Sequence, residues 1–315
     1  MLSPAELGWD LGLFAQEVIA ERFRVTAELA AAASRDPAPP ALHHLRVSCR
    51  RLREAVSFFA DAPEMPPLGK VAKAAARLMR SVRRLRELDV SQERLAALGD
   101  GLLDAEAERA RAELAGSTLR ERRTVARRQH PRIARRVRKL RALIALRGPA
   151  RGELPLPGTD LATAEARARG FLEARMAERR AVIEELAGGL TDRSPDGRRL
   201  HEVRVALKHW RYACEIGRLA IPLERRAALA AGLRRLQDLG GAHQDLVDLA
   251  RSTEAAATAA GKRRRKRLEL LLQICVAARE DAAARFVDGL RAVLATTPLS
   301  SQLSERYTAG EGGAA

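Results

Sequence analysis

Apolar residues recur every three or four positions along almost the whole chain, which is the period of an α-helix. No segment alternates apolar and polar residues as a half-buried strand does. Clusters of proline and glycine interrupt the pattern and divide it into eight predicted helices. We expect these helices over residues 4–34, 41–60, 68–98, 102–147, 160–188, 196–220, 222–258 and 262–297. The pattern therefore predicts an all-α fold, with Pro131 kinking or restarting the fourth helix and Gly240-Gly241 weakening the seventh.

One segment is typical of a linker between domains. Residues 147–160 read RGPARGELPLPGTD, in which prolines and glycines cannot continue a helix and few side chains could pack. We expect a first four-helix bundle over residues 1–148, a linker over 149–159 and a second four-helix bundle over 160–298. Residues 299–315 end in AGEGGAA and are predicted to form a flexible tail.

The two predicted bundles share a sequence repeat. LHHLRVSCRRLRE at 42–54 aligns with LHEVRVALKHWRY at 200–212. The same ungapped shift of 158 residues aligns Arg77 with Arg235 and Glu87 with Asp245. One shift that holds across several helices favours an internal duplication, so we expect two bundles related by pseudo-two-fold symmetry.

The aligned segments carry cationic side chains spaced three, four and three residues apart. At about 100° per residue these positions share one narrow stripe of a helix, opposite the apolar positions. The first stripe consists of His43, Arg46, Arg50 and Arg53, and the second of His201, Arg204, Lys208 and Arg211. A third row follows on the next predicted helix at Lys70, Lys73, Arg77, Arg80 and Arg84. Such rows are often only solvated faces, but recurrence of one pattern after a duplication favours a ligand-binding role.

Composition sharpens the choice of partner. The 315 residues include 57 Lys and Arg against 40 Asp and Glu, a net charge of +17, which favours polyanionic partners. Aromatic residues make up only 3%, too few for a protein that stacks successive nucleic-acid bases. Three scattered cysteines indicate neither a disulfide framework nor a zinc site. We see neither a signal peptide nor a membrane-spanning stretch, and expect a cytoplasmic protein without membrane partners.

The two stripe segments, with RSVRRLRELDV and RRLQDLGGAHQDLVDL from the following helices, resemble the signature of the conserved histidine α-helical domain (CHAD) family over roughly residues 5–297. The resemblance implies paired four-helix bundles that bind inorganic polyphosphate in a basic groove or pore, with polyphosphate or storage granules as a destination. It assigns both stripes to the ligand site, with Arg77, Arg80 and Arg84 as a next tier. Tyr212 follows the second stripe and could offer its hydroxyl to a phosphate.

The second half departs from this pattern in its third helix. The counterparts of the third row are Ala228, Ala231, Arg235, Asp238 and Ala242, so only Arg235 keeps a positive charge. Basic residues of the fourth helices are secondary candidates that could compensate. They are Arg120, Arg123, Arg127, Arg128 and the run Lys262–Arg267.

The sequence indicates no catalytic residues, resident metal or cofactor. It lacks a phosphate-binding Gly-rich loop and an H-E-x-x-H helix, and we expect a protein that is not an enzyme. Four acidic residues could be pictured as metal ligands, but pairing with arginines is the more ordinary role; they are Glu87, Asp89, Asp245 and Asp248. Each stripe histidine could instead be a buried hydrogen-bond partner of Glu87 or Asp245. Non-specific nucleic-acid binding is the alternative function, and a scaffold that docks on an anionic surface is a third.

Overall fold

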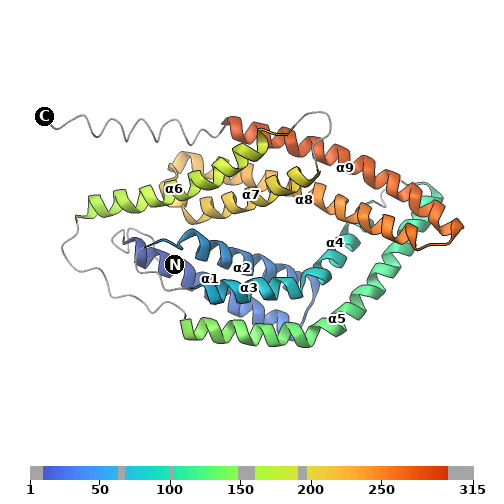
Figure 1. Ribbon diagram of the computed structural model, residues 1–315, viewed down its shortest axis with the longest axis horizontal. Coiled ribbons are helices and arrows are strands. Elements are labelled where there is room, and N and C mark those ends of the chain that lie inside the picture. The colour runs from blue at the N-terminus through green and yellow to red at the C-terminus, as the bar shows by residue number, and fades with distance from the viewer. Residues whose placement is uncertain (1–9, 63–67, 99–102, 148–159, 191–196, 297–315) are drawn as a thin grey trace. The chain divides into compact units, whose positions relative to one another are not determined.

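The computed structural model describes residues 10–62, 68–98, 103–147, 160–190 and 197–296, and in this part of the chain every regular element is helical (Figure 1). The all-α prediction is confirmed. The predicted linker at 149–159 and the tail at 299–315 lie outside the described residues. The helices are α1 (Leu11–Arg35), α2 (Pro39–Phe58), α3 (Gly69–Ser81), α4 (Arg83–Ala97), α5 (Ala105–Arg147), α6 (Leu161–Ala187), α7 (Gly197–Ile216), α8 (Leu223–Thr258) and α9 (Lys262–Thr296), with a short 3-10 turn at Arg218–Ala220.

Several helices begin where the sequence supplies a cap. Asp10 accepts a hydrogen bond from the Leu13 amide at 2.7 Å, and Asp104 accepts one from Ala107 at 2.8 Å. Proline occupies the first position of α2, where its missing amide hydrogen has no cost. Pro131 does not interrupt α5, which continues as one helix through it, and α8 likewise continues through Gly240-Gly241.

The single helix predicted over 68–98 is wrong in one respect, because it divides at Val82 into α3 and α4. At this break the Val82 amide donates to the Leu78 carbonyl at 3.3 Å, and the Ser81 hydroxyl donates to the same carbonyl at 2.7 Å. The carbonyls near the end of α3 are therefore open to side-chain donors.

The described residues form two compact units. The first unit comprises the residues up to Ala168 together with Asp245–Ala278. The second comprises Arg169–Gln244 and the residues from Arg279 onward. The segment Asp245–Ala278, which the sequence pattern assigns to the second bundle, thus belongs to the first unit.

In the first unit, α5 packs against α1, α3 and α4, and α2 packs against α1 and α3 (Figure 1). The rings of Phe14 and Phe59 meet edge to face at 5.9 Å between centroids. A second core joins α4 and α5 to the end of α8 and the start of α9. Its largest buried side chains are Leu95, Leu114, Leu249, Leu268 and Leu271. Each buried leucine contributes about 1.5–3 kcal/mol, which explains why Asp245–Ala278 stays with this unit.

The core of the second unit surrounds Trp210 of α7, which is completely buried. The guanidinium of Arg180, from α6, lies 5.7 Å from the centre of its ring. Phe286 of α9 is also fully buried, and its ring lies against Gly240 of α8. Close packing of α7 on α8 brings the second cationic stripe beside α8.

Candidate anion-binding surfaces

The first stripe lies along α2, opposite the face that this helix buries in the first unit. His43 and Arg53 are exposed, whereas Arg46 and Arg50 are half-buried. The opposite face carries the buried side chains Leu42, Leu45, Cys49, Leu52 and Phe58. The helical period thus predicted correctly which face of this segment enters the core.

Arg46 is the most constrained cation of this stripe. Its Nη1 donates to the Met79 carbonyl of α3 at 3.2 Å, one of the carbonyls opened by the break at Val82. Burial lowers the pKa of Arg46 to about 10, and the neighbouring positive charges of Arg50 and Arg86 act in the same direction. The guanidinium is still charged at neutral pH but is destabilised by its surroundings, so an added anion would be favourable.

His43 is exposed and does not bond to Glu87, one of the two alternatives drawn from the sequence. Glu87 instead accepts from Arg83 at 2.7 Å. Partial burial and then the positive charge of Arg86 lower the pKa of His43, with a further contribution from His44. His43 is therefore mainly neutral at pH 7 in the free protein, and a bound polyanion would favour its protonated form.

The third row is split between two helices. Lys70, Lys73, Arg77 and Arg80 are exposed on α3, and no carboxylate of the described residues contacts them. Arg84 belongs to α4 and bonds through Nη2 to Glu121 of α5 at 2.5 Å. This pairing neutralises Arg84, so the structure gives it a structural contact that the other members of the row lack.

The second stripe lies along α7 in the second unit. His201 is exposed, and its Nδ1 shares a hydrogen bond of 2.6 Å with Oε1 of Gln244 rather than with Asp245. Arg204 and Lys208 are half-buried. Gln244 lies 43 positions after His201, and Arg86 lies 43 positions after His43. The residue near each stripe histidine therefore occupies the equivalent position in its half of the sequence.

The end of this stripe is less accessible. Arg211 is half-buried, lies 3.8 Å from the Glu215 carboxylate and stacks 4.4 Å above the ring of Tyr212. Tyr212 is only 2% exposed. Its ring belongs to the core beneath Arg211, and this burial gives the predicted hydroxyl contact with a phosphate no support.

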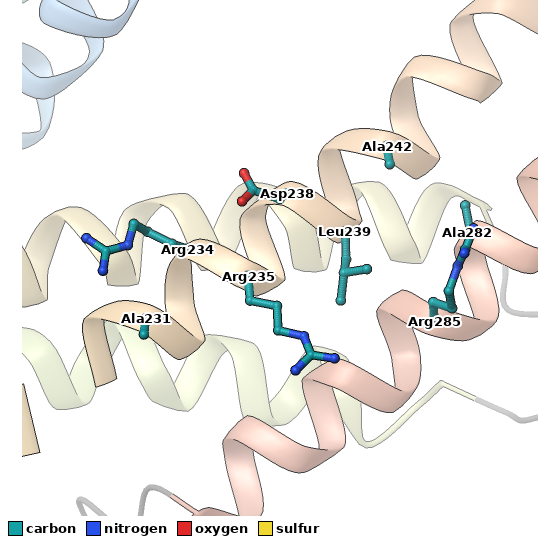
Figure 2. A pocket seen from close by; sticks show the side chains of 8 residues that line it. All are labelled: Ala231, Arg234, Arg235, Asp238, Leu239, Ala242, Ala282 and Arg285. Atoms are coloured by element: carbon teal, nitrogen blue, oxygen red, sulfur yellow. The ribbon is translucent and has the colours of Figure 1, made fainter. Parts of the chain in front are cut away.

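In the second unit, residues at positions that correspond to the third row line a hollow of about 610 Å³ between α8 and α9 (Figure 2). Ala231, Asp238 and Ala242 line it at the positions that Lys73, Arg80 and Arg84 hold in the first half. Short side chains thus leave open space here. The remaining lining residues are Arg234, Arg235, Leu239, Ala282 and Arg285, and Arg285 is already paired with Asp281 at 2.5 Å.

Sequence reasoning missed a group of arginines on α5. Arg136 donates through Nη1 to the Arg77 carbonyl of α3, and Arg132 precedes it by one turn on the same helix. Burial lowers the pKa of Arg136, followed by the charges of Arg132 and Arg80. Because α5 carries arginines on every side, its sequence has no distinct stripe; only packing against α3 distinguishes these two.

Three of the six basic residues at the start of α9 form ion pairs within the first unit. Arg267 donates to Glu113 at 2.7 Å, Arg264 lies 3.3 Å from the same carboxylate, and Arg265 donates to Glu269 at 2.9 Å. The two contacts with Glu113 fasten α9 to α5, and the Arg265–Glu269 pair lies within α9; together they neutralise part of the run.

The four carboxylates considered as metal ligands pair with arginines: Glu87 with Arg83, Asp89 with Arg122, Asp245 with Arg94 and Asp248 with Arg251. Within the described ranges, no group of three or more His, Cys, Asp or Glu residues could hold a metal ion. Among the described helices, none is long and apolar enough to cross a membrane.

Comparison with protein families matches the CHAD domain over residues 17–254, more than half of the chain. Among solved structures, the CHAD domain from the plant Ricinus communis is similar, with a TM-score of 0.67 and 21% identity over 92% of this chain and 93% of that one. PptA from Streptomyces chartreusis has a TM-score of 0.47 and 20% identity over 88% of this chain and 99% of that one. Comparison with curated proteins yields no match. The Ricinus communis structure shows a shared fold.

Proposed function

Because the chain belongs to the CHAD domain family, and because α2 and α7 carry matching cationic stripes, we propose that it binds inorganic polyphosphate along these stripes without catalysing a reaction. Polyphosphate presents closely spaced negative charges and no bases. A receptor must therefore rely on a matching array of cations, in which arginine supplies forked donors and lysine a point charge. Rigid helices hold such an array in place before the ligand arrives.

The observation that carries the proposal is the environment of Arg46. Burial, followed by the charges of Arg50 and Arg86, holds the pKa of this half-buried guanidinium at about 10, and Glu87 offsets only part of this effect. Repelling cations held together by the fold destabilise the free protein slightly and gain stability when an anion neutralises them. In the described part of the chain, Arg50 and Arg53 have no carboxylate contact. Within the first stripe, they are the arginines best available to phosphate oxygens.

The second stripe supports the same function with a different balance of contacts. His201, Arg204 and Lys208 repeat the order of the first stripe; His201 is exposed, and Arg204 and Lys208 are half-buried. Arg211 contributes less, since it is stacked on Tyr212 and near Glu215. We further propose that the two stripes arose by internal duplication, and that the protein is cytoplasmic and associates with polyphosphate or storage granules.

The direct test is a titration of end-labelled long-chain polyphosphate, followed by fluorescence anisotropy. The variant carries Arg50→Glu and Arg53→Glu, since neither side chain forms a hydrogen bond or an ion pair with another described residue. Two charge-assisted hydrogen bonds of about 1.5–3 kcal/mol each predict at least a 100-fold loss of affinity. The matched control carries Arg138→Glu and Arg141→Glu, two exposed arginines of α5 that change the net charge equally. Equal losses in both variants would show that net charge alone attracts the ligand.

Two further measurements distinguish polyphosphate binding from non-specific nucleic-acid binding and from enzymatic hydrolysis. Duplex DNA at equal phosphate concentration and physiological salt should fail to displace polyphosphate; displacement would favour the non-specific nucleic-acid-binding function. Incubation of polyphosphate with Mg²⁺ or Mn²⁺ should release no phosphate, whereas release that is lost in the stripe variant would identify an enzyme. Raising the salt concentration should weaken binding steeply, because association releases condensed counterions.

A further inference from the structure

The arginines of α3 and α5 form a second concentration of positive charge in the first unit. We define the α3–α5 cluster as Arg77 and Arg80 of α3 with Arg132 and Arg136 of α5. Arg136 is bonded to the Arg77 carbonyl, so the two helices hold the cluster together directly. Arg77, Arg80 and Arg132 are exposed, and no carboxylate of the described residues contacts any of the four guanidinium groups.

The cluster is unfavourable for the free protein. Burial and the charges of Arg132 and Arg80 lower the pKa of Arg136, and Arg135 and Arg77 act in the same direction. A bond from Arg136 to a carbonyl near the end of α3 offsets only part of this repulsion, since the partial negative charge there is small. Neutralisation by a bound anion would remove it.

The geometry of α3 relates this cluster to the α2 stripe. Arg46 of α2 bonds the Met79 carbonyl, and Arg136 of α5 bonds the Arg77 carbonyl. At about 100° per residue, these two acceptors lie roughly 200° apart around α3, so the arginines approach from opposite flanks of the helix. Leu78 and Ala75 occupy the buried side between them.

The exposed side of α3 carries further cations between these two flanks. Arg80 lies about 100° around the helix from Met79 and about 60° from Arg77, and Lys73 lies close to Arg80 on the same side. Both side chains are exposed. Cations thus lie on both flanks of α3, at Arg46 of α2 and at Arg136 of α5, and Arg80 and Lys73 lie on its solvent side between them.

We propose that a polyphosphate chain bound to the α2 stripe continues across the exposed face of α3 and onto Arg132 and Arg136 of α5, which makes the first unit selective for long chains. This inference rests on the proposed function. A helix with its side chains is about 10 Å across, so a short oligophosphate held by the α2 stripe does not reach α5. In the second unit the α8 counterparts of Lys73 and Arg80 are Ala231 and Asp238, so these two cations are missing there.

The test compares two ligands on one variant. Arg132→Glu alters an exposed side chain without a bond in the structure, and Arg138→Glu on the same helix is its matched control. We expect Arg132→Glu to weaken binding of polyphosphate of about 100 units at least tenfold, as α5 contacts are lost. Tripolyphosphate should displace the long chain from the α2 stripe, and its own affinity should differ less than twofold between the Arg132→Glu variant and the unaltered protein. The control should change either affinity less than threefold.

The binding measurements distinguish failure of the path across α3 from failure of polyphosphate binding itself. If the unaltered protein does not bind long-chain polyphosphate, the proposed function is wrong and this inference with it. If the unaltered protein binds but Arg132→Glu behaves like Arg138→Glu, only the path across α3 is wrong. Equal weakening of long-chain polyphosphate and tripolyphosphate by Arg132→Glu would overturn the proposed chain-length selectivity. Circular dichroism of each variant, unchanged at 222 nm, establishes that the fold is retained.

Discussion

Adjacent glycines in α8 should respond to alanine substitution with opposite signs. A Cβ added at Gly240 would lie 2.9 Å from Cε2 and 3.0 Å from Cζ of Phe286, whose ring is completely buried. Such overpacking costs about 1–3 kcal/mol. A Cβ at Gly241 has no heavy atom within 4 Å. Because both residues lie inside one helix, alanine stabilises each by about 0.5–1 kcal/mol through helix propensity.

The difference between Gly240→Ala and Gly241→Ala therefore isolates the steric contribution, about 1–3 kcal/mol. We expect Gly241→Ala to unfold at a higher urea concentration than the unaltered protein and Gly240→Ala at a lower one, followed by circular dichroism at 222 nm. The same Cβ at Gly240 would lie 3.4 Å from Cγ of Arg204, so this glycine also permits the close approach of the second stripe. Equal midpoints for the two variants would refute the tight packing of the Phe286 ring of α9 against Gly240 of α8.

The buried carboxylate of Asp89 lies 2.6 Å from Nε of Arg122, and Arg122→Ala leaves it without its cation. This variant should lower the free energy of unfolding, measured by urea titration, by about 3 kcal/mol. Arg83→Ala, at an exposed ion pair, should change that free energy by less than about 1 kcal/mol. Burial raises the pKa of the thiols of Cys49, Cys214 and Cys275 to about 11–12. None of them should react with Ellman's reagent at pH 8 until guanidinium unfolds the chain. Rapid reaction of the native protein would contradict this. Burial and the charge of Arg86 lower the pKa of His43 in the free protein, whereas the negative charge of a bound polyanion would raise it. Binding should therefore take up a proton, measured by calorimetry in two buffers, and affinity should fall as the pH rises above the lowered pKa of the free protein; His43→Gln should lose that uptake.

The first stripe shows how far local pattern extends. Spacing alone placed His43 and Arg53 on an exposed face and Leu45 and Leu52 in the core, since both follow from the helical period. The pattern could not show that Arg46 bonds a carbonyl of another helix. That contact is possible because α3 ends at Ser81, which leaves the carbonyl of Met79 without its partner in the helix.

Arg84 and Arg136 show the opposite limits of the same reasoning. Arg84 continued a regular row in the sequence, yet it is neutralised by Glu121, which is distant in the sequence. Arg136 belonged to no row, yet it adjoins the exposed cations of α3. Charge spacing within one helix identifies neighbours on that helix, whereas neutralisation depends on which helix lies opposite.

By itself, the sequence determined the helical class, the limits of most helices and the face that α2 and α7 each bury, because these properties arise from interactions among residues a few positions apart. Tertiary structure alone decided that Asp245–Ala278 joins the first unit, that α3 and α4 separate, and that Arg132 and Arg136 lie against α3. An apolar stripe specifies that a helix must be covered but not which helix covers it; that choice is made by the packing of side chains distant in the sequence.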